Sequence, residues 1–184
     1  MVRAQRFADI GSGQTVLVIG SGISGLLHIQ LARTRGAARI IATDISEYRL
    51  NAAKRFGADG IINGAEDVPA RLREANDGRL ADRVIVCTGA MPGIQQAIKS
   101  LDRGATLLFF APTTAGIDVP IPLFDFWRDE IKVVTSYAGS GADLQESLRL
   151  ISERKVRVGD MLCAGVKSDS FAHPNVLCSI RSNR

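Results

Sequence analysis

Short apolar runs alternate with helix-like segments along almost the whole chain, and this alternation restricts the fold more than any other feature. The first run, residues 15–19 (TVLVI), is continuous, as in a strand buried on both faces. Parallel strands need crossovers, and right-handed helical crossovers cover both sheet faces. We therefore expect an α/β, doubly wound fold with a six-stranded parallel sheet in the order 3-2-1-4-5-6. The predicted strands are residues 15–19, 39–44, 59–63, 83–87, 106–110 and 131–135.

Helical spacing of apolar residues predicts the segments between the strands. The first of them ends at Gly36 and carries four apolar residues at helical spacing, Ile23, Leu26, Leu27 and Leu31. Ser46 is expected to cap the second helix, because a serine side chain can accept a hydrogen bond from a free N–H of the first turn. The predicted helices cover residues 22–35, 46–56, 66–76, 92–101 and 142–154.

Composition places the chain among ordered globular proteins, with 46% hydrophobic and 23% charged residues. No apolar run approaches the roughly 18–20 residues that a membrane span needs, so we expect no membrane partner. The first six residues have no apolar segment behind them, unlike a secretory signal. Three cysteines, an odd number at wide spacing, argue against a disulfide framework and indicate a cytoplasmic location.

The net charge of +4 does not indicate a nucleic-acid partner. Residues 155–184 hold five basic and two acidic side chains, so the rest of the chain is nearly neutral. Aromatic residues are only 5% of the sequence, and basic residues are interleaved with acidic ones. A nucleic-acid-binding face usually shows clustered basic residues and stacking aromatic rings. We therefore expect a solvated surface of mixed charge and no nucleic acid.

Gly20, Gly22 and Gly25 form a G-x-G-x-x-G motif that follows the first strand and opens the first helix. In a dinucleotide-binding Rossmann fold, the first glycine permits the tight turn and the second lets a pyrophosphate approach the backbone. The third lets the helix pack closely on the strand. The N–H groups at the helix start, those of Ile23 and Ser24 among them, attract phosphate. We predict that these five residues bind a dinucleotide; a merely structural turn is the alternative.

Asp44 ends the second predicted strand, 19 residues after Gly25. A carboxylate at this place can accept hydrogen bonds from the hydroxyls of the adenosine ribose and would repel a 2′-phosphate. The sequence therefore predicts NAD as the cofactor, with NADP less favoured. Alternatively, Asp44 is an exposed cap of the following helix. Arg49 faces the same edge, where it can steady the ribose, pair with Asp44 or remain solvated.

Two further segments are expected along the cofactor. Cys87, Thr88 and Gly89 end the fourth predicted strand, and Ala111 follows the fifth. Ligands of open α/β sheets bind outside the carboxyl ends of the strands, near the point where the strand order reverses. Cys87 is interpreted as a small buried residue and not as a nucleophile, since no basic partner lies nearby in the sequence.

No catalytic residue and no metal site are predicted. We find no convincing nucleophile–base pair in the sequence. Cys163, His173 and Cys178 are separated by ten and five residues, spacings that fit no zinc motif. His28 is interpreted as a helix-face residue and not as a catalytic base.

Taken together, these motifs resemble the cofactor-binding domain of the medium-chain, zinc-containing alcohol dehydrogenase superfamily, especially its sorbitol and threonine dehydrogenase-like branches. The resemblance covers residues 13–158, about three quarters of the chain. It rests on residues 15–32, on residues 41–59 and on the sequence Ser-Tyr-Ala-Gly at 136–139. It implies an NAD(P)-binding Rossmann domain over residues 1–158. In the complete family enzyme, hydride passes between NAD and an alcohol or polyol.

The chain also departs from the family. Residues 159–184 form a divergent C-terminal tail, and the family's zinc ligands, a cysteine and a Gly-His-Glu motif, are absent. No zinc is therefore expected in this chain, and whether it is itself an enzyme stays open. The alternatives are a non-catalytic NAD-binding module or an inactive truncated fragment. A methyltransferase is disfavoured by the full glycine motif and by the lack of a terminal antiparallel hairpin.

A homodimer is expected through the edge of the sheet. The segment from Ile131 to Ser136 is last in the predicted strand order and carries one charge and no proline, so it lacks most devices that protect a free edge. Residues 112–127 are predicted to form a long ordered loop with a short helix, which adds Phe124, Phe126 and Trp127 as an exposed apolar surface beside that edge. The resemblance implies the same pairing, because related dehydrogenases join two sheets edge to edge.

Overall fold

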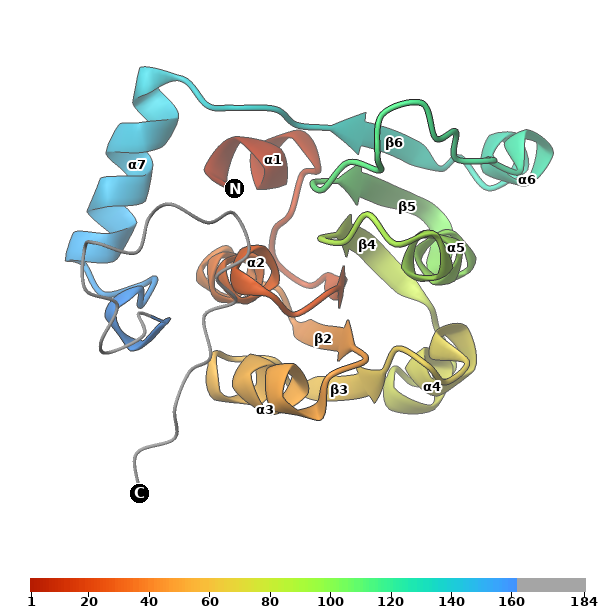
Figure 1. The fold of residues 1–184 in the computed structure, drawn as a ribbon, viewed down its shortest axis with the longest axis horizontal. Coiled ribbons are helices and arrows are strands. Elements are labelled where there is room, and N and C mark those ends of the chain that lie inside the picture. Colours follow the sequence, from red (N-terminus) through yellow and green to blue (C-terminus); the bar gives the residue numbers. More distant parts are fainter. Residues whose placement is uncertain (162–184) are drawn as a thin grey trace.

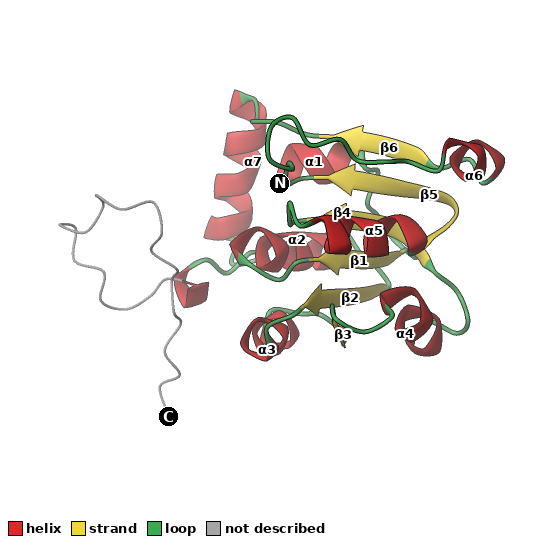
Figure 2. Cartoon of the chain, turned by 45° about the vertical axis from the view of Figure 1, so that its right-hand side comes forward, coloured by secondary structure: helices red, strands yellow, loops and turns green. Residues whose placement is uncertain are grey.

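The fold is built on one parallel sheet with helices on both faces (Figures 1 and 2). The computed structural model describes residues 1–161 of the 184-residue chain. The strands are β1 (Thr15–Ile19), β2 (Arg39–Asp44), β3 (Gly60–Asn63), β4 (Ala81–Val86), β5 (Leu101–Phe109) and β6 (Lys132–Thr135). The helices are α1 (Val2–Phe7), α2 (Ile23–Thr34), α3 (Glu47–Arg55), α4 (Val68–Ala75), α5 (Met91–Lys99), α6 (Leu123–Arg128), α7 (Gly141–Ser152) and the 3₁₀ turn η1 (Gly159–Met161).

The predicted strand order is confirmed. The six strands are parallel and lie in the order β3-β2-β1-β4-β5-β6. Ile19 is in register with Thr43 on one side and with Val86 on the other, and Val86 is in register with Phe109. The carboxyl ends of four strands therefore reach the same edge of the sheet, where a doubly wound fold places its ligand.

Each face of the sheet has its own apolar core. Every residue of β1 is buried, and alternate side chains point to opposite layers, Val16 and Val18 to one and Leu17 to the other. The layer around Val16 is completed by α1, α2 and α3. The layer around Leu17 is completed by α4, α5 and α6. The continuous apolar runs of the sequence follow from this double burial.

Helix α1 was not anticipated from the sequence. Its segment has few apolar residues, yet Val2, Ala4 and Gln5 are buried because the helix lies between α2 and α7. Arg6 joins α1 to α7 through an ion pair, with Nη2 at 2.9 Å from Oδ1 of Asp143. The helix is thus stabilised by tertiary contacts, which its local sequence does not reveal.

Three local predictions are corrected. Strand β5 begins at Leu101, five residues before the predicted start, and its register with β4 shifts before Arg83. Ile23 belongs to α2 but is 61% exposed, so it is not part of the core stripe. Ser46 stands at the N-cap of α3 without a side-chain cap bond; its N–H instead donates to Oδ1 of Asp44. The predicted divergent tail is residues 159–184, and its part from residue 162 onward lies outside the described residues.

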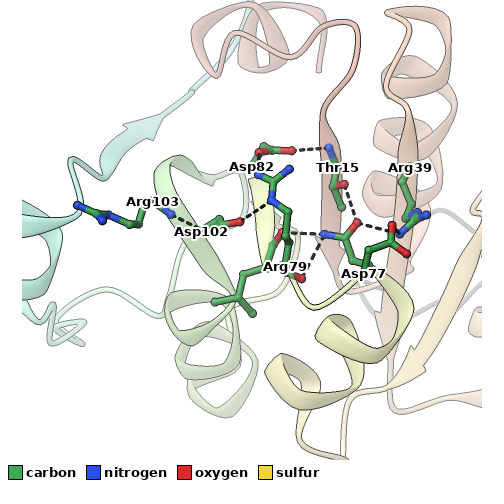
Figure 3. Close-up of polar contacts among 9 residues, drawn as sticks. Thr15, Arg39, Asp77, Arg79, Asp82, Asp102 and Arg103 are labelled. Atoms are coloured by element: carbon green, nitrogen blue, oxygen red, sulfur yellow. Dashed lines mark hydrogen bonds and ion pairs between the residues drawn. The ribbon is translucent and has the colours of Figure 1, made fainter.

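Polar side chains close the sheet at the amino ends of its strands (Figure 3). Thr15 donates its N–H to Oδ2 of Asp82 at 2.7 Å and its hydroxyl to Oδ1 of Asn76 at 2.9 Å. Arg39 reaches the same Asn76 oxygen at 3.0 Å. Arg79 forms ion pairs with Asp82 and with Asp102. The polar groups at the amino ends of the strands bind one another through hydrogen bonds and ion pairs. We therefore interpret these residues as structural.

None of the helices within residues 1–161 combines the length and the apolar character of a membrane span.

Candidate functional site

The predicted cofactor residues come together at the carboxyl edge of the sheet. They follow four neighbouring strands, β1, β2, β4 and β5, whose ends are level with one another. Two backbone bonds lock these ends: the N–H of Cys87 donates to the carbonyl of Ile19, and the N–H of Ala111 donates to that of Val86. The candidate residues at this edge are Gly20, Gly22, Ile23, Ser24, Gly25, Asp44, Arg49, Cys87, Thr88, Gly89 and Ala111.

The three glycines of the turn after β1 differ in what requires glycine at each position. Gly20 has φ +93°, a left-handed conformation that disfavours side chains. A Cβ at Gly25 would lie 2.0 Å from the carbonyl oxygen of Gly20, so the helix could not pack this closely with any larger residue. A Cβ at Gly22 would meet nothing within 4 Å. Nothing inside the described chain therefore requires glycine at position 22, whereas a bound pyrophosphate would.

The start of α2 is not capped by any side chain of the described chain. Its N-cap is Gly22, and the N–H of Leu26 makes a bond to the carbonyl of Gly22 at 2.9 Å. The N–H groups of Ile23, Ser24 and Gly25 precede that bond and have no acceptor within the helix. Three N–H groups together with the positive end of the helix dipole form an anion-binding position.

Asp44 holds the glycine turn against β2. Its side chain is buried, and Oδ2 accepts the N–H of Ser21 at 2.9 Å while Oδ1 accepts the N–H of Ser46 at the same distance. The carbonyl of Thr43 adds two further bonds, from the N–H of Gly20 and from the hydroxyl of Ser21. Sequence reasoning missed Ser21. A hydroxyl residue inside the glycine motif was the available signal.

Arg49 lies beside this carboxylate. Its Nη1 is 3.7 Å from Oδ2 of Asp44, so of the three alternatives the structure shows the pairing with Asp44, and the Arg49 side chain is 42% exposed. An ion pair at that distance is loose, so the guanidinium is able to turn toward a ligand. Arg49 therefore pairs with Asp44 while its side chain stays partly solvated.

The loops after β4 and β5 approach each other closely. A Cβ at Gly89 would lie 2.5 Å from the carbonyl oxygen of Pro112, so only glycine permits this contact. The hydroxyl of Thr88 accepts the N–H of Ala90 at 3.2 Å. Burial raises the pKa of the Cys87 thiol to about 12. The thiol therefore stays protonated near neutral pH, which supports its interpretation as a packing residue.

His28 is fully buried on the side of α2 that faces α1. Its Nδ1 is 3.1 Å from Nε2 of Gln5, and its ring meets that of Phe110 edge-on at 4.5 Å between centroids. Burial lowers the pKa of His28 to about 3, so the ring is neutral near neutral pH. Within residues 1–161, no group of three or more His, Cys, Asp or Glu is arranged to hold a metal. Cys163, His173 and Cys178 lie outside the described residues.

These features fit a dinucleotide. The uncapped start of α2 and the open position at Gly22 suit a pyrophosphate, and the Asp44 carboxylate lies next to them at the end of β2. Each carboxylate oxygen has two lone pairs, so an oxygen that already accepts one N–H can accept a ribose hydroxyl as well.

Comparisons with known proteins give the family. The sequence profile of the zinc-binding dehydrogenases matches residues 24–153, and the chain belongs to this family. It is 32% identical over 171 residues to a probable D-xylulose reductase A of Aspergillus clavatus, which covers 90% of this chain and 47% of that protein. The chain thus spans about half the length of the curated relatives it matches.

Solved structures agree with the fold. A protein of Clostridium scindens described as a zinc-binding dehydrogenase has a TM-score of 0.77 at 30% identity over 83% of this chain and 43% of its own. A Sinorhizobium meliloti protein of the same description, solved with NADP, has a TM-score of 0.78 at 24% identity. It covers 84% of this chain and 46% of its own, and at this identity it supports the fold alone.

Proposed function

We propose that residues 1–158 form the nucleotide-binding domain of an alcohol or polyol dehydrogenase and bind NAD at the carboxyl edge of the sheet. The observation that carries the proposal is the start of α2, where three N–H groups and the space at Gly22 stand open beside the buried Asp44. The family supports a dehydrogenase, and the D-xylulose reductase relative favours a polyol as the substrate class.

In this proposal each group has a distinct role. The N–H groups of Ile23 and Ser24 hold the pyrophosphate, and Asp44 accepts the ribose hydroxyls. The loops at Thr88, Gly89 and Ala111 support the nicotinamide half of the cofactor. When bound, the nicotinamide supplies the hydride acceptor. Cys87 takes no part in proton transfer, because its raised pKa keeps it neutral.

NAD is the preferred cofactor in this proposal. We infer that the carboxylate of Asp44 would face the 2′-phosphate of a bound NADP, and like charges a few ångströms apart repel by about 1 kcal/mol or more even in a wet site. The Sinorhizobium meliloti relative was solved with NADP, and Arg49 of this chain offers one cation that could contact a 2′-phosphate. The preference for NAD therefore depends on whether Asp44 repels a 2′-phosphate more strongly than Arg49 attracts it. The side chain of Asp44 is the more buried of the two.

Calorimetric titration of the full chain tests this proposal. NAD is expected to bind at least about fivefold more tightly than NADP, the ratio that 1 kcal/mol gives. Gly22→Val should abolish binding while the chain stays folded, because the added side chain fills the pyrophosphate position. Gly11→Val is the matched control, since a Cβ at Gly11 also meets nothing within 4 Å but lies before β1, at the opposite edge. Unchanged NAD affinity in Gly22→Val would show that the turn is structural only.

A catalytic chain and a non-catalytic NAD-binding module share this binding site. They differ in turnover, so alcohol-dependent formation of reduced nicotinamide by the full chain separates them. A chain that binds NAD but reduces none of it with a series of alcohols and polyols is a binding module or an inactive fragment.

We also propose that two copies pair through β6. This strand is last in the sheet, and Val133 on it is 41% exposed. Helix α6 beside it exposes Phe124 and Trp127, the latter by 74%. The expected exposure of Phe126 is wrong, because its side chain packs into the core layer around Leu17. Light scattering at tens of micromolar should give a dimer, and Val133→Lys should shift it to monomer by placing a charge on the apolar edge. A wild-type chain that stays monomeric would contradict the pairing.

A further inference from the structure

Helix α1 is joined to α2 by two polar side chains that are both fully buried, Gln5 and His28. The amide nitrogen of Gln5, Nε2, donates to the backbone carbonyl of His28 at 2.8 Å and lies 3.1 Å from Nδ1 of the His28 ring. An amide nitrogen carries two hydrogens, so it can make both contacts at once. We call these two residues the Gln5–His28 pair.

The backbone carbonyl of His28 determines where the neutral ring carries its hydrogen. A carbonyl oxygen only accepts hydrogen bonds, so it turns the nitrogen of the Gln5 amide toward α2. The same nitrogen faces Nδ1, which must therefore accept as well, and the hydrogen of the neutral ring is assigned to Nε2. In the described part of the chain, Nε2 of His28 and Oε1 of Gln5 have no hydrogen-bond partner. The Gln5–His28 pair is thus matched to a neutral ring.

A second proton on the ring would break this match. It would lie on Nδ1, where it faces the N–H of Gln5, so that two donors meet. Rotating the amide by half a turn would bring Oε1 to the protonated Nδ1. The same rotation would bring that oxygen to the carbonyl of His28, where two acceptors would meet. Either orientation leaves a buried contact between like groups, which is costly away from water. A protonated His28 therefore favours a chain in which α1 has left this position.

The charges around the ring do not compensate a proton on it. Burial is the first cause that lowers the pKa of His28, and the positive charge of the Met1 ammonium is the second. The Cys87 thiol stays neutral, because burial raises its pKa to about 12. The carboxylate of Asp143 on α7 is already paired with Arg6 of α1. The titratable and charged groups of the elements around the ring are Met1, Arg6, Arg35, Cys87 and Asp143.

We propose that the Gln5–His28 pair is an acid-sensitive latch, which holds α1 against α2 while the ring is neutral and releases α1 when the ring takes up a proton. Helix α1 is suited to local opening, because it has six residues and no side-chain cap bond at its N-terminus. Its release uncovers the core layer around Val16 at the place where Ala4 and Ala8 pack. The proposal depends neither on nucleotide binding nor on a dimer.

Hydrogen exchange of single backbone amides in the full chain tests the latch. The N–H groups of Ala8 and Ile10 report the opening of α1, and the amides of β1 report the opening of the whole fold. In the open form the ring takes up a proton near its ordinary pKa of 6.5, whereas in the closed form its pKa is about 3. Between pH 7.5 and pH 5.5 the protection of the two α1 amides, corrected for the intrinsic exchange rate, should therefore fall about tenfold. Low urea should speed exchange in β1 but hardly in α1, because α1 opens alone.

Three variants separate the ring from its surroundings. His28→Gln does not titrate but keeps the Met1 ammonium, so it should remove the tenfold factor that belongs to the ring. Gln5→Glu should reverse the sign. A buried carboxylate accepts the Nδ1 proton and raises the pKa of the ring above its ordinary value, so protection is greatest in acid and is lost as the pH rises. Gln145→Glu is the matched control, the same exchange at an exposed position of α7, and should behave as the wild type.

An equal pH dependence of the α1 amides in the wild type and in His28→Gln would overturn the latch. So would a loss of protection in acid that keeps its sign in Gln5→Glu. If either variant loses the protection of β1 and does not fold, the wild-type chain still decides the question. An α1 whose protection follows that of β1 in urea opens only with the whole fold and has no latch of its own.

Discussion

Helices α2 and α7 have the same length, 12 residues, but they are stabilised in opposite ways. In α2 seven residues are buried, and its N-cap is a glycine with no side chain. In α7 two residues are buried, and its N-terminus is closed by a capping box. There the N–H of Ser140 donates to Oδ2 of Asp143 at 2.8 Å, and the N–H of Asp143 donates to the hydroxyl of Ser140 at 3.3 Å.

The difference explains which helix is free to bind a ligand. Burial of a large aliphatic side chain contributes about 1.5–3 kcal/mol, and α2 buries Leu26, Ile29 and Leu31. A good N-cap contributes about 1 kcal/mol. Packing therefore stabilises α2 without a cap, and its first N–H groups remain available to a phosphate. Helix α7 packs on less surface, and its own side chains occupy its N-terminus.

The largest expected effect follows from the packing of α2. Gly25→Ala should destabilise the chain by about 3 kcal/mol or more, because its Cβ would lie 2.0 Å from a backbone oxygen that cannot move without opening the turn. Gly22→Ala is the matched control and should cost about 1 kcal/mol or less, the ordinary loss at an N-cap. Urea unfolding measures both. Similar midpoints for the two variants would mean that the turn relaxes freely.

A smaller effect is expected from the carboxylate that holds the turn. Asp44→Ala leaves the N–H groups of Ser21 and Ser46 without their acceptor and should cost about 1–3 kcal/mol. Under the proposed function it should also reduce the ratio of NAD to NADP affinity, since the charge proposed to repel a 2′-phosphate is gone and Arg49 remains. Urea unfolding and calorimetric titration give the two numbers. A variant with full stability and an unchanged cofactor ratio would remove Asp44 from both roles.

Much of this arrangement could be predicted from the sequence, since the signals are local. The run at residues 15–19 and the glycines after it specify a buried strand, a tight turn and a helix, and the structure contains all three. Helix α1 could not be predicted, because Ala4 and Gln5 are buried by α2 and α7, which are distant in the sequence. The early start of β5 also depends on pairing with β4 rather than on apolar character.

The candidate site likewise has features that the sequence predicts and features that it does not. Glycine at positions 20, 22 and 25 and an acid at 44 follow from a known turn geometry, so their meeting at one edge was predictable. The bonds from Ser21 to Asp44 and Thr43 were not, because they join residues 23 and 22 positions apart whose relative orientation is set by the sheet. Sequence spacing likewise placed Ile23 in the core stripe, although as the first residue of α2 it lies at the exposed end of the helix.

Acid should lower the stability of the folded chain through His28, the buried histidine of α2. In the unfolded chain this ring takes up a proton near its ordinary pKa of 6.5, whereas in the folded chain its pKa is about 3. Between these values the unfolded state binds one more proton, so His28 lowers stability by about 1.4 kcal/mol per pH unit as the pH falls below about 6.5. His28→Gln does not titrate and should flatten this dependence in urea unfolding between pH 7 and pH 5.5. An equal slope in the variant would assign the acid sensitivity to other groups.

The smallest expected effect tests the cap of α7 itself. Ser140→Ala removes the acceptor for the N–H of Asp143 and should cost about 1 kcal/mol. Ser46→Ala is the matched control, because Ser46 occupies the N-cap of α3 but makes no side-chain cap bond, so its loss should cost a few tenths of a kcal/mol at most. Urea unfolding distinguishes the two. NAD affinity should not change in Ser140→Ala, since Ser140 precedes α7 and is not one of the residues proposed to bind the cofactor. If Ser46→Ala costs as much as Ser140→Ala, the capping bond is not what stabilises the start of α7, and the contrast with α2 would rest on burial alone.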